Sequence, residues 1–543
     1  MINKRKLQDE EDIWQLKDDD EMIKCRVDED NQFNVLYQRS FSPNDFYNYE
    51  DIMYKCFSLF YQNNYKLIII EDGNTGGKTE LCYPCAQYVR PKIKKQTITT
   101  LKSTPLLYET FFLTDEMLNP ETCFPYTEKD NIWEGKEVIY SDGTDTVNHK
   151  MTKEIDSFNI YEKKIMERKR VEFLETKNTK KPTEVLVFTD GASFSCGGDF
   201  IRGLQVYGYG IIVGFNSRPG LKKSEFDSSQ SNSGVEKFDH SKYAQSLKEL
   251  GFIPRITYTQ KFDPNDKDSP KIPMEFKIYP VDEIANIYLE YEDDEYDRFI
   301  EEAKIIFNKY NDLDNGKCNP DNKNLFYETN LCDSKLEIDK AHGGYLCGTD
   351  GKWNKSNCIA AYCDQGFILS DDRTECVRDP CQDITLKEIS IKETKDIEYI
   401  IQPNNAYIFT VEKENFSYYF YSEFEKFFYV FNEKHVLEAV KNGTEFMLND
   451  KIYVNYFVNI TSNTNVNIKV VNHNPDKEEE EKEEDKQDKN TNNLSGRAIA
   501  LIIIASIIVI IAIILIIIHY KRKKIMSDTE IENKTEQLNS ILQ

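Results

Sequence analysis

Residues 181–215 read KPTEVLVFTDGASFSCGGDFIRGLQVYGYGIIVGF. The apolar run VLVF is typical of a buried strand, the Asp-Gly pair after it predicts a tight turn, and a helix is expected to begin at Ser195. A serine between such a strand and helix, here Ser193, is expected to lie exposed beside the helix N-terminus, where a nucleophile is well placed. The alternative is that Ser193 and Ser195 only cap the helix, as serines commonly do.

A second strand followed by a glycine-rich turn lies earlier in the chain, at residues 66–80, which read KLIIIEDGNTGGKTE. A phosphate-binding loop needs four residues between its first glycine and the Gly-Lys pair, and Gly73 leaves only three. We therefore expect no bound nucleotide. The alternative is a strand-to-helix turn in which the N–H groups near Gly76 and Gly77 stabilise a developing oxyanion.

The remainder of residues 1–315 alternates short apolar runs with amphipathic stretches, which predicts an α/β core. The runs at 67–70, 185–188 and 211–213 are expected to be its buried strands. Residues 126–181 are highly charged, so we expect an insertion that contains a surface helix and carries no chemistry. A final amphipathic helix is predicted to close the domain. Its apolar face consists of Phe299, Ala303, Ile306 and Phe307.

These pieces resemble the tail-specific, or C-terminal processing, serine peptidases over roughly residues 33–310. Members of that family show an Asn-x-Gly-Gly turn, then a Ser-x-Ser strand-to-helix junction, then an apolar Val-Gly strand. Here the matching pieces are GNTGG, GASFSC and the hairpin-like GYGIIVGFNSRPG. The resemblance implies a crotonase-like α/β peptidase core, a peptide or protein substrate and no cofactor.

The resemblance also implies roles for particular residues. Ser193, the first serine of the junction, matches the family's nucleophile, which forms an acyl-enzyme with the substrate. The N–H group of Phe194 would be one oxyanion donor, and that of Gly76 or Gly77 would be the other.

The general base is harder to place. In the bacterial branch of the family it is a lysine shortly after the Val-Gly strand, and here Arg218, which cannot be deprotonated, stands near the expected position. Lys222 is therefore the candidate base, although it is displaced along the chain. Another branch uses a histidine from the upstream part, supported by a serine and a glutamate, but this chain has no histidine before His149. His149 and His240 lie in polar stretches and are expected to be exposed loop residues.

A cysteine-rich module is predicted at residues 316–381, because more than half of the chain's 13 cysteines fall there. The density favours disulfides over a zinc site, since the spacing lacks paired Cys-x-x-Cys ligands and only His342 lies among them. The number of cysteines in the module is odd, so one is expected to pair elsewhere or stay free. They are Cys318, Cys332, Cys347, Cys358, Cys363, Cys376 and Cys381.

The remaining segments suggest a membrane-anchored protein. Residues 382–472 contain short β-branched and aromatic runs, which predict a small all-β domain. Residues 473–496 are too charged to bury a core and predict an extended acidic stalk. The uncharged run 498–518 is long enough for one transmembrane helix. The basic cluster directly after it predicts that the tail, residues 519–543, is cytoplasmic.

That orientation places the rest of the chain outside the cell or in the secretory lumen. The amino-terminal residues lack the apolar core of a signal peptide, so we expect the natural start to lie further upstream. Asn-x-Ser/Thr sequences mark candidate glycosylation sites on the outer side of the span. They are Asn354, Asn415, Asn442, Asn459 and Asn493.

Two functions fit these patterns. The first is a membrane-anchored serine peptidase that acts on a peptide or protein substrate through Ser193. The second is a catalytically inactive cell-surface binding or adhesion protein that uses the peptidase fold as a scaffold. The formal net charge of −25 argues against nucleic acid as a partner, because a phosphate backbone needs basic surface.

Overall fold

The chain divides into two units, Met1–Asn472 and His473–Gln543. The computed structural model describes residues 13–472 outside a set of gaps and none of residues 473–543. The predicted stalk, span and tail therefore lie outside the described residues. Within the described part, no helix has the length and apolar character needed to cross a bilayer. The gaps are 95–98, 105–117, 124–125, 127–131, 134, 136, 142–145, 157, 159, 238–249, 253–254, 264–271, 289–295, 393–394, 403–404, 412–415, 423–426, 432–436, 442–445, 448–452 and 458–463.

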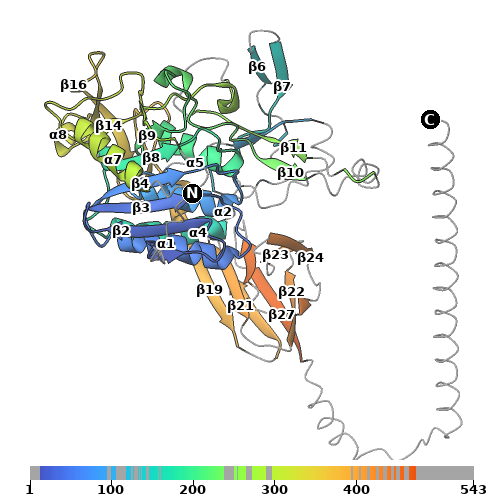
Figure 1. Ribbon diagram of the computed structural model, residues 1–543. Coiled ribbons are helices and arrows are strands. Elements are labelled where there is room, and N and C mark those ends of the chain that lie inside the picture. The colour runs from blue at the N-terminus through green and yellow to red at the C-terminus, as the bar shows by residue number, and fades with distance from the viewer. Residues whose placement is uncertain are drawn as a thin grey trace, which may run out of the picture. The chain divides into compact units, whose positions relative to one another are not determined.

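A seven-stranded sheet with the order β1-β2-β3-β4-β8-β9-β13 forms the centre of the first part of the chain (Figure 1). Strands β3 to β13 pair in parallel, whereas β1, β2 and β3 are antiparallel. The GYGIIVGF segment is thus a parallel inner strand, and the expectation of a hairpin there is wrong. The bounds are β1 Leu16–Lys17, β2 Ile23–Asp28, β3 Phe33–Gln38, β4 Lys66–Glu71, β8 Val185–Thr189, β9 Ile211–Gly214 and β13 Glu283–Ile284.

Helices cover both faces of this sheet. One apolar cluster joins alternate strand residues to the helices α1, α2 and α5, and a second joins the other strand residues to α7. A strand that is buried on both faces has apolar residues at successive positions. For this reason the three apolar runs predicted as strands correspond to β4, β8 and β9. The mixed α/β prediction is therefore confirmed. The helices are α1 Phe46–Phe60, α2 Thr79–Val89, α4 Ile160–Leu174, α5 Ser195–Val206 and α7 Tyr296–Tyr310.

Smaller two-stranded sheets surround this core. Strand β5 pairs with β12, β6 with β7, and β10 with β11, each pair antiparallel. Short 3-10 helices occupy Pro182–Glu184, Lys223–Glu225 and Met274–Phe276. The bounds are β5 Thr99–Leu101, β6 Glu137–Ser141, β7 Thr146–Lys150, β10 Val235–Lys237, β11 Arg255–Thr257 and β12 Thr259–Lys261.

The cysteine-rich module folds as short strands held by disulfides, which confirms the choice of disulfides over zinc. Cys318 pairs with Cys347, Cys332 with Cys358, and Cys363 with Cys376. The seventh cysteine, Cys381, pairs outside the module with Cys123. The elements are β14 Phe326–Glu328, α8 Asn330–Asp333, β15 Ala341–Cys347, β16 Trp353–Cys363, β17 Phe367–Leu369, β18 Cys376–Arg378 and a 3-10 helix at Pro380–Asp383.

The module packs directly onto the α/β part. Trp353 belongs to the apolar cluster of α7, and its indole N–H donates to the Tyr310 carbonyl at 3.1 Å. Phe326 belongs to the cluster on the opposite face of the sheet. Apolar packing is therefore continuous between the α/β part and the cysteine-rich module, although the composition changes near residue 315.

The described part of residues 385–472 consists of strands in two sheets, with the orders β19-β21-β26-β23-β24 and β20-β27-β22-β25. The bounds are β19 Thr385–Ile391, β20 Ile397–Ile401, β21 Asn405–Val411, β22 Phe416–Ser422, β23 Phe427–Phe431, β24 Leu437–Lys441, β25 Phe446–Met447, β26 Tyr453–Phe457 and β27 Thr464–Asn472.

Of the predicted glycosylation sites, Asn354 lies partly exposed on β16, and the other four lie outside the described residues.

Helix α4 has an exposed face, which carries Arg168, but its other face is buried although it is charged. The Lys163 and Arg170 side chains are only 6% and 2% exposed. Each charge has a partner, since Lys163 pairs with Asp156, and Arg170 pairs with Glu167 at 2.7 Å. Buried charges are tolerated when they are paired, so a highly charged helix can still lie within the fold.

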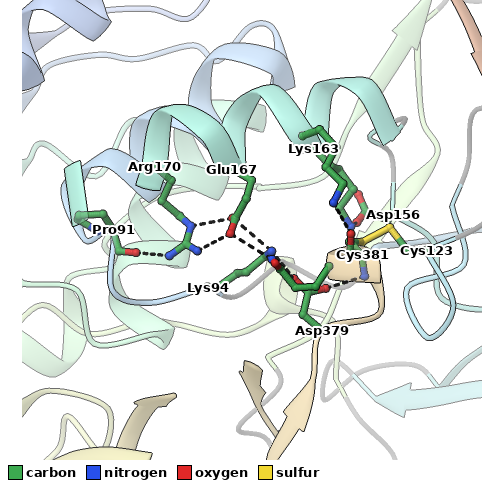
Figure 2. Close-up of polar contacts among 11 residues, drawn as sticks. Pro91, Lys94, Cys123, Asp156, Lys163, Glu167, Arg170, Asp379 and Cys381 are labelled. Atoms are coloured by element: carbon green, nitrogen blue, oxygen red, sulfur yellow. Dashed lines mark hydrogen bonds and ion pairs between the residues drawn. A yellow bond between two sulfur atoms is a disulfide. The ribbon is translucent and has the colours of Figure 1, made fainter. Parts of the chain in front are cut away.

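Figure 2 shows how this helix joins the cysteine-rich module. Lys94 lies between Glu167 of α4, at 3.2 Å, and Asp379, with which it also pairs. The Cys123–Cys381 disulfide lies beside these ion pairs. Burial alone would raise the pKa of Glu167, but Arg170 and Lys94 outweigh it and hold that pKa at about 2. The insertion therefore helps to fix the module in place.

Candidate active site

The junction between β8 and α5 is a sharp turn. Gly191 has φ +74°, and the first residue of the helix, Ser195, has φ +51°. Glycine adopts this left-handed region freely, but serine does so at a cost of about 1–2 kcal/mol. Such a strained residue on a strand-to-helix turn is the backbone geometry of a nucleophile elbow.

The two serines of the junction differ in exposure. Ser193 is 0% exposed, and its Oγ is buried with no hydrogen-bond partner in the described part of the chain. Ser195 is partly exposed, and its backbone N–H donates to the Ser231 carbonyl at 2.7 Å. A substrate can reach Ser195 in this conformation, whereas Ser193 would first have to be uncovered.

The glycine-rich turn after β4 is organised by Asn74, which is fully buried. Its Nδ2 donates to Glu71 Oε2 at 2.8 Å, and its Oδ1 accepts from the Gly76 N–H at 2.9 Å. Its backbone carbonyl accepts from the Phe194 N–H at 2.9 Å. One asparagine thus joins the glycine-rich turn to the serine junction.

These bonds determine which N–H groups remain for an oxyanion. Those of Gly76 and Phe194, both predicted donors, are already donated to Asn74. The N–H groups of Gly77 and Cys196 have no acceptor among the described residues. Cys196 lies in the first turn of α5, where backbone N–H groups have no partner within the helix.

The two turns are in van der Waals contact. A Cβ built on Gly76 would lie 2.8 Å from Ser195 Cβ and 3.0 Å from the Cys196 nitrogen. Only a glycine permits this approach, which brings the bare backbone of the glycine-rich turn beside Ser195. A disulfide between Cys82 of α2 and Cys196 of α5 also ties the helices that follow the two turns.

Beneath the turn lies Glu71, which is fully buried. Burial raises the pKa of its carboxyl well above the ordinary value of 4.5. The group is therefore held in its protonated form over a range of pH in which an exposed glutamate is ionised. The Glu71 carboxyl accepts a hydrogen bond from the Asn74 side chain, which in turn accepts from the Gly76 N–H. In its protonated form Glu71 places no negative charge beneath the turn.

Exchanging Glu71 for glutamine is expected to make stability less dependent on pH. Because the folded-state pKa is raised, this group stabilises the fold most below pH 4.5, and its contribution falls as pH rises toward the folded-state pKa. Glu71→Gln removes that decline. Glu71→Ala leaves the buried Asn74 amide without its acceptor and is expected to cost about 1–3 kcal/mol. Urea unfolding between pH 4 and 8 measures both, and parallel pH profiles for wild type and Glu71→Gln would contradict the assignment.

A carboxylate is linked to the junction through Ser231. Glu275 Oε2 accepts from Ser231 Oγ at 3.3 Å and from Ser233 Oγ at 2.6 Å. Ser231 is the residue whose carbonyl accepts the Ser195 N–H. Glu275 thus lies near the elbow, with the Ser231 side chain bonded to Glu275 and the Ser231 backbone bonded to Ser195. No local pattern predicts this role for Glu275, because its position near Ser195 depends on segments 231–233 and 274–276 meeting in space.

The predicted base, Lys222, lies on a different segment from the two serines, as do His149 and His240, which the sequence predicts to be loop residues. Lys222 is exposed at the start of a 3-10 helix, and the structure places no contact between it and either serine. Its neighbour Lys223 pairs at 2.9 Å with Glu283 on the edge strand β13. His149 is on β7 of a separate two-stranded sheet, and His240 lies outside the described residues.

Comparisons with known proteins give a likeness in structure alone. No family model matches the sequence, and no curated protein matches it. Mature CPAF complexed with lactacystin is 14% identical with a TM-score of 0.26, and the match covers 52% of this chain and 53% of that one. The photosystem II D1 C-terminal processing protease is 11% identical with a TM-score of 0.22, covering 48% of this chain and 44% of that one.

A lipoprotein from Streptococcus agalactiae is 10% identical with a TM-score of 0.26, and the match covers 52% of this chain and 70% of that one. The chain spans about half the length of CPAF and of the D1 C-terminal processing protease. Likenesses at this level support no inference about activity.

Proposed function

We propose that this chain is a serine-type peptidase with Ser195 as its nucleophile. The observation that carries the proposal is the left-handed backbone of Ser195 at the start of α5, beside two N–H groups that have no acceptor in the part of the chain that the structure describes. Acyl transfer requires an accessible hydroxyl beside N–H donors for the oxyanion, and partly exposed Ser195 with the Gly77 and Cys196 N–H groups would supply both.

In the proposed reaction, Ser195 Oγ attacks the carbonyl carbon of a peptide bond. The N–H groups of Cys196 and Gly77 hold the oxygen that becomes negative. One of these belongs to the residue after the nucleophile and the other to a separate turn, as in other elbow sites. The tetrahedral intermediate then expels the amine and leaves an acyl-enzyme, which water hydrolyses.

We assign the proton transfer to Glu275. The proton that Ser195 Oγ loses passes to the Glu275 carboxylate. The glutamic acid then returns the proton to the leaving amine. The support for Glu275 is its proximity to the junction, because the Ser231 carbonyl accepts the Ser195 backbone N–H at 2.7 Å and the Ser231 hydroxyl donates to Glu275 at 3.3 Å. Lys222 and Ser193 remain the residues that the family resemblance predicts for base and nucleophile.

Labelling with a fluorophosphonate tests the proposal, because this probe reacts with activated serines. The full chain is expected to be labelled at Ser195, with labelling lost in Ser195→Ala and slowed about 100-fold or more in Glu275→Gln. Ser193→Ala is the matched control, because Ser193 lies two positions before Ser195 in the same junction, and this variant should keep its labelling. Labelling that is lost in Ser193→Ala and kept in Ser195→Ala would instead assign the nucleophile to Ser193.

A binding or adhesion protein is the second candidate. The observation that favours it is that no histidine, lysine or carboxylate of the described residues is in hydrogen-bond contact with Ser195 Oγ. A folded full-length chain that neither labels nor cleaves any peptide in a mixed library would support this function and remove the first.

We also propose that the α/β part and the modules after it lie outside the cytosol, anchored by the run 498–518. The six disulfides support this, because disulfides persist in oxidising compartments. Protease treatment of intact cells, read with an antibody against the tail, is the measurement. Protection in intact cells, followed by digestion of the α/β part once digitonin opens the plasma membrane alone, would contradict the topology.

A further inference from the structure

Helix α2 carries the sequence Cys82-Tyr83-Pro84-Cys85, a Cys-x-x-Cys pattern in its first half. Its two cysteines differ in state, because Cys82 is bonded to Cys196 of α5 whereas Cys85 is a free thiol. All three are buried, with exposures of 1% for Cys82, 3% for Cys196 and 0% for Cys85. A free thiol therefore lies one helical turn from an existing disulfide.

Helix geometry brings Cys85 within reach of Cys82. Residues i and i+3 lie on the same face, with about 5–6 Å between their Cβ atoms. A disulfide needs about 3.5–4.5 Å between those atoms, so the helix must tighten by only about 1–2 Å. Pro84 lies between the two cysteines and has no N–H for the helical hydrogen-bond ladder, which leaves the backbone there less firmly held.

We propose that Cys82 is a thiol–disulfide exchange centre that changes its partner from Cys196 to Cys85. The Cys85 thiolate attacks Cys82 Sγ, the Cys82–Cys196 bond breaks and the Cys82–Cys85 bond forms. Cys196 leaves as a thiolate and takes up the proton that Cys85 lost. The number of disulfides is unchanged, so the step needs neither an oxidant nor a reductant.

The exchange acts on the site because Cys196 directly follows Ser195. With the bond between the helices, the first turn of α5 is tied to the helix that follows the glycine-rich turn. With the bond inside α2, that tie is gone, and the strained backbone of Ser195 loses one of the constraints that hold it. This consequence rests on the proposed function, whereas the exchange itself does not.

The native pairing is held by burial. Burial raises the pKa of the Cys85 thiol well above its ordinary value, so the thiol keeps its proton and attacks slowly. Exchange therefore requires local opening of the first half of α2.

The test maps the pairing of the full chain in a series of glutathione redox buffers. Samples are quenched in acid, free thiols are capped with N-ethylmaleimide, and the peptides are identified by mass spectrometry. In wild type, the Cys196 thiol is expected to become free before that of Cys82. A peptide that contains the Cys82–Cys85 bond is expected to appear at the same time. In Cys85→Ser, and in Cys85→Ala should the serine variant fold poorly, Cys82 and Cys196 are expected to become free together.

Fluorophosphonate labelling of the same samples gives the functional readout. The exchanged form is expected to label about 100-fold more slowly than the native pairing, the usual effect of losing one oxyanion donor. Wild-type protein in which Cys82 and Cys196 become free together in every buffer overturns the exchange. An observed exchange in a protein that labels in neither form supports the exchange and removes the proposed function instead.

Discussion

Replacing Glu328 by glutamine is expected to lower the free energy of unfolding by about 3–5 kcal/mol, the cost of leaving one member of a buried ion pair alone. The Arg90 guanidinium is 0% exposed and pairs with Glu328 at 2.7 Å. Its other acceptor is the Lys180 carbonyl. Lys92, also paired with Glu328 at 3.0 Å, is 31% exposed and can turn to water, so the unpaired charge in the variant is that of Arg90.

The effect has a defined pH dependence. Burial alone would raise the pKa of Glu328, but Arg90 and Lys92 outweigh it and lower that pKa from 4.5 to about 2. A carboxyl with a lowered folded-state pKa contributes stability above pH 4.5 and loses it as pH falls toward 2. The difference between wild type and Glu328→Gln should therefore be full at pH 7 and shrink through this window.

Urea unfolding followed by tryptophan fluorescence measures the difference at each pH. The matched control is Glu388→Gln, because Glu388 pairs with Arg168 at 2.6 Å but the two side chains are 49% and 53% exposed. An exposed pair contributes about 0–1 kcal/mol, so the control should stay close to wild type. Equal losses of unfolding free energy for the two variants would contradict the larger cost assigned to the buried Arg90–Glu328 pair.

Gly77→Ala is the second change with a large expected effect. A Cβ on Gly77 would lie 2.1 Å from both the carbonyl carbon and oxygen of Phe41, and the backbone has φ +145°. Because the clash is with backbone, no side-chain rotation relieves it. The steric and conformational costs together are expected to exceed about 3 kcal/mol. The shift would also displace the Gly77 N–H, so labelling at Ser195 should fall about 100-fold or more.

Gly73→Ala is the control for this change. Gly73 lies in the same turn with φ +59°, but nothing lies within 4 Å of its Cβ position. Alanine there meets only the conformational cost of about 1–2 kcal/mol. Thermal unfolding and fluorophosphonate labelling of the two variants distinguish close approach from general intolerance of a side chain in the turn. Comparable losses in both would contradict the role given to the contact with Phe41.

Local patterns were sufficient for the α/β core. The apolar runs that became β4, β8 and β9 are buried on both faces, and the face of α7 repeats with helical spacing. Such signals depend on residues close together in the chain, so a single sequence reports them. The same signals did not reveal the buried face of α4, whose charges pair with residues that include Asp156 and Lys94, which lie outside the helix.

The sequence by itself determined where the candidate site lies, since the glycine-rich turn and the serine junction each follow an apolar strand. Only the tertiary structure decided how the site is arranged. The choice between Ser193 and Ser195 depends on backbone angles and burial, and the choice of oxyanion donors depends on the bonds of Asn74. The physical reason is distance along the chain: the Cys82–Cys196 bond joins residues 114 positions apart, and no local periodicity encodes such a contact.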